Sequence, residues 1–100
     1  QEEIFGPVAS IFNFETEDEA ISIANSTDFG LASGVFTSDD QKAKWTAERI
    51  EAGVIWHNDW FVDDVNLPGG GYKKSGYGRD GGVDSLYSYG QTKRVSKRLI

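Results

Sequence analysis

The residues best suited to chemistry stand at the start of the chain, in the segment Gln1-Glu2-Glu3-Ile4-Phe5-Gly6-Pro7-Val8. Glu3 and Phe5 are two positions apart, and side chains two apart share one face of an extended segment. A carboxylate there can accept hydrogen bonds from a ribose diol, while a ring beside it can pack on a flat heterocycle. Proline at position 7 restricts itself and the residue before it, so a regular element must end there. An exposed acid beside a core Phe is the alternative interpretation.

A second candidate is the glycine-rich stretch 69–82, which holds seven glycines and the pattern G-x-G-x-x-G at positions 76–81. A dinucleotide fingerprint must follow a buried strand and open a crossover helix. Here the preceding residues, 72–75, are Tyr-Lys-Lys-Ser, which do not form a buried strand pattern. We therefore reject the fingerprint. Glycines this dense let backbone segments pack closely, or present carbonyl groups to a cation.

The loop 59–67 mixes aromatic side chains with three acids, Asp59, Asp63 and Asp64. Ring faces and carboxylates together suit a cationic ligand. An ordinary interface loop has the same composition, and the sequence alone leaves both interpretations open.

The elements that must position these residues follow an alternating order. Three segments carry strand patterns, at 8–14, 31–37 and 54–57. Helices are expected between them, opened by capping boxes at Thr16–Glu19 and Ser38–Gln41. The order strand-helix-strand-helix-strand with short links predicts an α/β fold with a parallel sheet. Ligands of such sheets gather at the carboxyl ends of strands, which places Asn58 and the loop after it at the working edge.

The rest of the chain is expected to form smaller elements. Residues 83–89 fit a short helix. Residues 91–100 alternate apolar and charged side chains, which is typical of an exposed edge strand that pairs with another subunit.

Composition excludes several classes of protein. One hundred residues make at most one small domain. The absence of Cys excludes a disulfide framework and a thiol nucleophile within the chain, and a single His excludes a multi-histidine metal cluster. No apolar run approaches the roughly 20 residues of a membrane span, and no signal peptide opens the chain. We expect a cytoplasmic protein with no membrane partner. Because Met is also absent, we expect this chain to be a piece of a longer one.

Charge is distributed unevenly along the chain. Residues 1–66 carry 14 acids and 3 bases, whereas residues 67–100 carry 2 acids and 7 bases, so the net charges of −11 and +5 sum to −6. A basic end can bind nucleic acid. The overall negative charge, and the lack of stacking aromatics among the bases of the tail, argue against that function.

Several ordered motifs together resemble the carboxyl-terminal part of the NAD(P)-dependent aldehyde dehydrogenase superfamily, including its betaine-aldehyde-type members, over essentially all 100 residues. Residues 2–8 are similar to the family's Glu-x-Phe-Gly-Pro segment. Residues 52–58 resemble its Ala-Gly-x-x-x-x-Asn strand, and residues 68–79 match its glycine-rich segment. The resemblance implies that residues 1–90 belong to the catalytic domain and that 91–100 form the oligomerisation strand of a homodimer or homotetramer.

The resemblance also implies roles for individual residues. Glu3 would hydrogen-bond the nicotinamide ribose of NAD or NADP, with Phe5 near the nicotinamide ring. The loop from 59 to 69, with Asp63 and Gly69, would line the tunnel for a small-molecule aldehyde. Two further roles are implied by the betaine-aldehyde-type members. Lys73 and Gly76 would offer backbone carbonyls to a monovalent cation such as K⁺, and Asp80 would be a charge relay where those members carry Glu.

Departures from the family pattern refine these expectations. Most relatives place Phe or Trp where this chain has Gly69, so we expect a wider tunnel and a bulkier or differently shaped aldehyde. The acids at 59, 63 and 64 lean toward a cationic aldehyde. The family's cysteine nucleophile, general-base Glu, oxyanion Asn and main cofactor-binding fold lie upstream. We therefore expect this piece to lack turnover. A non-enzymatic module that pairs through its terminal strand is the alternative.

Overall fold

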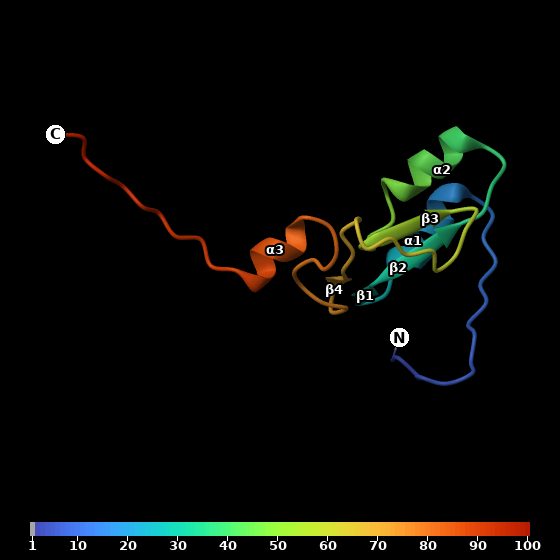
Figure 1. Cartoon of the computed structure of the whole chain (residues 1–100). Helices are drawn as coiled ribbons and strands as arrows, with labels where there is room; N and C mark the ends of the chain where they lie inside the picture. The colour runs from blue at the N-terminus through green and yellow to red at the C-terminus, as the bar shows by residue number, and fades with distance from the viewer. Residues whose placement is uncertain (1) are drawn as a thin grey trace.

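The computed structural model describes residues 2–100 as an α/β body with an extended segment at each end (Figure 1). The elements, in chain order, are α1 (Glu17–Asn25), β1 (Phe29–Gly30), β2 (Ala32–Val35), α2 (Asp40–Ala47), β3 (Val54–His57), β4 (Tyr72–Lys73) and α3 (Asp84–Tyr89). The second and third strand segments of the sequence prediction are therefore confirmed, β3 with its expected bounds.

The body is built on two small sheets. Strands β2 and β3 are parallel, in a register that runs from Ala32 opposite Val54 to Val35 opposite His57. Helix α2 connects them and contributes a buried side chain, Ala43, so the expected crossover is confirmed. Strands β1 and β4 form a second, antiparallel pair that the sequence did not predict. This pair ties the glycine-rich segment to the chain just before β2.

Side chains cap both longer helices at their amino ends. The Thr16 hydroxyl accepts a hydrogen bond from the Glu19 backbone N–H at 3.2 Å, as the predicted capping box requires. At α2 the prediction is wrong by one residue. Asp39, and not Ser38, is the cap, because its carboxylate accepts hydrogen bonds from the backbone N–H groups of Gln41 and Lys42 at 2.9 and 3.0 Å. One carboxylate oxygen thus satisfies two orphan donors.

Two expected strands do not form. Segments 8–14 and 91–100 have no strand structure, and their apolar side chains are exposed, with Ile11 and Leu99 each at 88%. A strand needs a neighbour to accept and donate its backbone hydrogen bonds, and neither segment pairs with another described strand. In this single chain the segment 91–100 reaches away from the body (Figure 1). Since that strand is expected to pair with another subunit, the oligomerisation strand stays a prediction.

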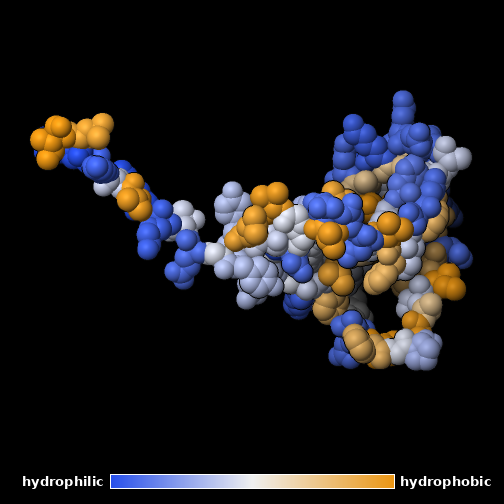
Figure 2. Space-filling model, in the orientation of Figure 1, coloured by the Kyte–Doolittle hydropathy of each residue, from blue (hydrophilic) through white to orange (hydrophobic). Residues whose placement is uncertain are grey.

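The chain buries little of its surface. Its accessible surface is 8922 Å², whereas a compact protein of 11.0 kDa exposes about 5,600 Å². The buried apolar side chains of the described residues are only Ala43 and Ala52. Hydrophobic residues reach the surface across the body and at the tip of the carboxyl-terminal tail (Figure 2). Across residues 2–100, no helix combines the length and apolar character that a membrane span needs.

Candidate functional site

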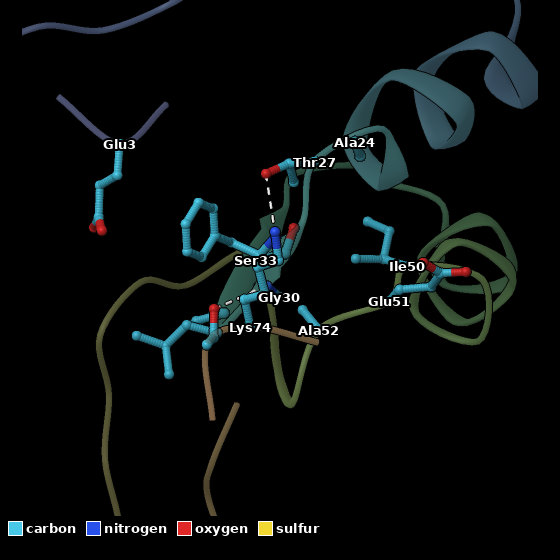
Figure 3. A pocket seen from close by; sticks show the side chains of 13 residues that line it. Glu3, Ala24, Thr27, Gly30, Ser33, Ile50, Glu51, Ala52 and Lys74 are labelled. Atoms are coloured by element: carbon cyan, nitrogen blue, oxygen red, sulfur yellow. Dashed lines mark hydrogen bonds between the residues drawn. The ribbon is translucent and has the colours of Figure 1, made fainter. Parts of the chain in front are cut away.

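Glu3 faces a cavity of about 470 Å³ on one side of the body. The opposite walls come from the end of α1, from β1 and β2, and from the turn after β4 (Figure 3). Glu3 comes from the separate amino-terminal segment and lies apart from the other labelled residues (Figure 3). The carboxylate is exposed, so it can accept hydrogen bonds from a ligand.

Phe5 does not join Glu3 at this cavity. Its φ angle is 52°, in the left-handed region, so the backbone is not extended at that position. The expectation that Glu3 and Phe5 share one face rests on an extended backbone, and that premise is wrong here. Phe5 is 92% exposed and is not among the residues that line the cavity. Roles for both residues in nicotinamide binding stay predictions.

Two hydroxyl groups that the sequence analysis did not single out shape the wall of this cavity. The Ser75 hydroxyl accepts a hydrogen bond from the Gly30 backbone N–H at 2.9 Å, and the Thr27 hydroxyl accepts one from the Phe29 N–H at 3.2 Å. The contact between Ser75 and Gly30 spans 45 residues. It was not predictable without knowing that β1 and β4 pair.

A second cavity, of about 720 Å³, brings together three predicted site residues. Asp63, Gly69 and Asp80 all line it, although 17 positions separate the first from the last. Gly69 and Asp80 are joined by two backbone hydrogen bonds, of 2.7 and 2.8 Å, which fix the glycine-rich segment in place. The Asp80 carboxylate accepts a hydrogen bond from the Gly81 N–H at 2.9 Å.

The aromatic side of this cavity follows from where β3 ends. Asn58, directly after β3, has a φ of 54° and turns the chain. Its amide group accepts from the Thr37 N–H at 2.8 Å and donates to the Thr37 carbonyl at 2.7 Å, so it ties the carboxyl ends of the two parallel strands together. The following loop therefore leaves from the predicted working edge.

Two tryptophans meet at that edge. The ring centroids of Trp56 and Trp60 are 5.2 Å apart with their planes tilted by 59°, so the rings form a corner. The ring of Phe61 lies 6.4 Å from that of Trp56. The Trp56 indole N–H donates to the Val62 carbonyl at 2.7 Å, which anchors the loop on the strand. Both tryptophans and Phe61 line the second cavity.

Asp64 stays negatively charged at this cavity. The backbone N–H of Asn66 donates to its carboxylate at 2.9 Å, and the Asn66 side-chain amide donates to the same oxygen at 2.8 Å. These hydrogen bonds, the backbone one first, lower the pKa of Asp64 below its ordinary value because they favour the ionised form.

The sequence profile of the aldehyde dehydrogenase family matches residues 1–95. The chain belongs to this family. It is similar to an NAD-dependent aldehyde dehydrogenase from Sinorhizobium meliloti, with 46% identity over 93% of this chain and 18% of that one, and a TM-score of 0.89. It is also similar to betaine aldehyde dehydrogenase from Staphylococcus aureus, with 46% identity over 89% of this chain and 18% of that one, at a TM-score of 0.85.

A third similar protein is indole-3-acetaldehyde dehydrogenase from P. syringae, solved with NAD⁺ and IAA, with 47% identity over 89% of this chain and 18% of that one, at a TM-score of 0.85. The chain thus spans about a fifth of the length of the family members that it matches. Those matched proteins include one named for betaine aldehyde and one named for indole-3-acetaldehyde, so the family match alone does not choose a substrate.

In this member of the family, the Lys73 side chain contacts backbone carbonyls and a carboxylate from other elements of the fold. Its ammonium group donates to the carbonyls of Asn25 and Thr27 at 2.9 and 3.1 Å, and pairs with the Glu51 carboxylate at 2.6 Å. It therefore fastens the end of α1 and the link before β3 to β4. Its own backbone turns with a φ of 52°. The sequence predicts a role only for the Lys73 backbone carbonyl, so these side-chain contacts are an additional finding.

Among residues 2–100, no three Asp, Glu, His or Cys side chains group as a metal site. A cation at Lys73 and Gly76 would therefore depend on backbone carbonyl oxygens. Gly76, with a φ of 153°, has a conformation that suits glycine. The cation site stays a prediction.

Proposed function

We propose that the full-length protein containing this chain oxidises an aldehyde to a carboxylic acid with NAD. The observation that carries this proposal is the family match over residues 1–95, together with similar structures named as NAD-dependent or solved with NAD⁺. The nucleophile would be a cysteine elsewhere in the full-length protein, since these 100 residues contain no Cys. Attack of that thiolate on the aldehyde gives a thiohemiacetal.

NAD, when bound, would accept the hydride that leaves the thiohemiacetal carbon, and water would then hydrolyse the resulting thioester to the carboxylic acid and the free thiol. Glu3 would hold the nicotinamide ribose, because its exposed carboxylate can accept two hydroxyl hydrogen bonds. Phe5 would pack near the ring after the first segment takes an extended conformation in the complete fold. The second cavity would form part of the tunnel for the aldehyde, bordered by Asp63 and Gly69, with Asp80 as a charge relay in place of the family's Glu.

The catalytic test follows the absorbance of reduced nicotinamide with a panel of aldehydes. Full-length protein is expected to turn over and the 100-residue chain alone is not. Turnover by the chain alone would contradict the requirement for an external cysteine. Absence of turnover by the full-length protein with every aldehyde would refute the assignment.

Glu2, next to Glu3 in the sequence, provides a matched control for the proposed role of Glu3. We expect Glu3→Gln to raise the KM for NAD about tenfold, as the loss of charge-assisted hydrogen bonds predicts, while Glu2→Gln leaves it near the original value. Equal KM values for the two variants would remove Glu3 from the cofactor site. The cation at Lys73 and Gly76 is proposed from the resemblance alone and enters no step.

A second candidate function is subunit pairing through residues 91–100. The exposed alternation of Val95 and Leu99 with basic residues favours it, because such a segment can add to the edge of a partner's sheet. We expect a homodimer or homotetramer. Removal of residues 91–100 from the full-length protein should yield a smaller species in analytical ultracentrifugation, and an unchanged mass would contradict this proposal.

A further inference from the structure

The second cavity has an uneven distribution of charge. Its lining residues include three carboxylates, Asp63, Asp64 and Asp80, and no Lys, Arg or His. Asp64 is held in its ionised form by the two hydrogen bonds from Asn66. A cavity with acids on its walls and no compensating base favours a positively charged occupant.

The bases nearest in sequence are turned to other partners. The Arg79 guanidinium donates to the carbonyls of Gly71 and Gly78, at 3.2 and 2.7 Å, and lies 5.2 Å from the centre of the Tyr72 ring. Lys73 is bound to the end of α1, and Lys74 pairs with Asp28. The positive charges of the glycine-rich segment thus have their own anionic, carbonyl or aromatic partners, and none of these three bases lines the cavity.

The second feature of the cavity is the corner made by Trp56 and Trp60. Two rings whose planes differ by 59° present faces in two directions, so a rounded cation in front of them can contact more than one face. Trp60 is seated over Gly34, where an added Cβ would lie 3.1 Å from its ring, so the strand below supports the ring. Phe61 extends the aromatic surface.

The third feature is space. Gly69 lines the cavity without a side chain, and an added Cβ there would meet only Val54, at 3.7 Å. The cavity of about 720 Å³ is therefore open at this position. A bulky head group such as a quaternary ammonium fits there better than in a tunnel narrowed by a ring.

We propose that this cavity selects aldehydes that carry a positively charged ammonium group, through the tryptophan corner and the surrounding carboxylates. The inference rests on the proposed dehydrogenase function, and it decides between the cationic and the neutral aromatic aldehydes for which the similar proteins are named. Charge complementarity carries it, since a neutral ring would gain from the tryptophans but nothing from the acids.

The test compares two aldehydes of the same shape in the full-length protein. Trimethylammonioacetaldehyde and tert-butylacetaldehyde differ only in the charge of the central atom. The expected kcat/KM ratio favours the cation by about tenfold or more, from ring-face and carboxylate attraction combined. A ratio near or below one, with measurable turnover of the neutral aldehyde, would overturn this inference and leave the dehydrogenase assignment standing. Inactivity with every aldehyde would overturn both.

Variants locate the selectivity in the cavity. Trp60→Leu and Asp63→Asn should each lower the ratio about threefold to fivefold, whereas Asp18→Asn, an acid on α1 away from the cavity, should not change it. A binding measurement independent of turnover is the change in tryptophan fluorescence on titration with tetramethylammonium chloride. Saturable quenching that weakens in Trp60→Leu supports the inference. No saturable change, or the same affinity in both proteins, contradicts it.

Discussion

Gly53 is the position where one added methyl group should do the most damage. A Cβ there would lie 1.6 Å from the Gly70 carbonyl oxygen and 2.7 Å from its carbon, both backbone atoms. An ordinary contact needs about 3.4 Å, so the segments that begin β3 and border the second cavity would have to separate by about 1.8 Å, which is 3.4 minus 1.6. No rotamer change can relieve a contact between backbone atoms.

We expect Gly53→Ala to lower the free energy of unfolding by about 3 kcal/mol, the upper end of ordinary overpacking costs. In a protein as long as the matched family members, this loss of stability corresponds to a fall in Tm on the order of 6 °C. Gly69→Ala is the matched control, because its Cβ would make only an ordinary contact with Val54. Differential scanning fluorimetry of the two full-length variants measures both, and the KM for aldehyde reports the state of the cavity.

If Gly53→Ala and Gly69→Ala unfold at the same temperature, the close approach of β3 to the glycine-rich segment does not exist in the folded protein. Insoluble Gly53→Ala beside soluble Gly69→Ala would agree with the expected steric conflict.

Three further outcomes follow from the described contacts. Lys73→Met should lower the free energy of unfolding by about 2 kcal/mol, since it removes an ammonium group from two carbonyls and a carboxylate. Chemical denaturation should show a smaller loss for Lys74→Met. Equal losses for the two variants would contradict the role of Lys73 in joining α1 to β4. Asp39→Ala should cost about 1 kcal/mol through loss of the α2 cap, whereas Ser38→Ala should be neutral by the same measurement; the reverse order would restore the sequence-based assignment. The hydrogen bond from Lys74, and then its charge, lower the pKa of Asp28, so the stability from this pair is present above the ordinary carboxyl pKa and is lost as the pH falls through the lowered value. In Lys74→Met the pKa of the Asp28 carboxyl, measured by NMR, should rise. An unchanged pKa would contradict the pairing of Asp28 with Lys74.

Local patterns were enough to predict the parallel part of the fold. A hydroxyl followed by an acid three residues later marks the start of α1 at Thr16–Glu19. A run of apolar residues marks β3 at Val54–His57. The short links between these elements then determined their parallel arrangement. The one-residue error at α2 arose because Ser38 and Asp39 are both good caps, and only the backbone geometry chose the acid.

The sequence could not give the contacts that join distant segments. The antiparallel pairing of β1 with β4 connects residues that are more than 40 positions apart, and each strand is only two residues long. No local pattern marks so short a strand. Gly53 shows the same limit, because its close approach to the Gly70 backbone is a contact that no local pattern marks.

The structure brings some of the predicted site residues together and leaves others apart. Asp63, Gly69 and Asp80 were predicted from motifs, and the structure places all three at one cavity because the Gly69–Asp80 backbone pairing folds the glycine-rich segment back onto β3. Glu3 and Phe5 are not brought together, because the first segment has no strand partner to hold it extended.

The two segments that failed to form strands also explain the large exposed surface. Residues 8–14 and 91–100 carry exposed apolar side chains, and the chain exposes 8922 Å² where a compact fold of its mass would expose about 5,600 Å². Since the chain covers only 18% of the related structures, we expect the covering surface to come from the rest of the full-length protein and from a partner subunit. The second cavity also has supports within this chain, because backbone hydrogen bonds hold Gly69 and Asp80 together and an indole N–H anchors the aromatic loop on β3. We therefore expect selectivity for the aldehyde to depend on residues of this chain, whereas turnover by the full-length protein would need a cysteine outside these 100 residues.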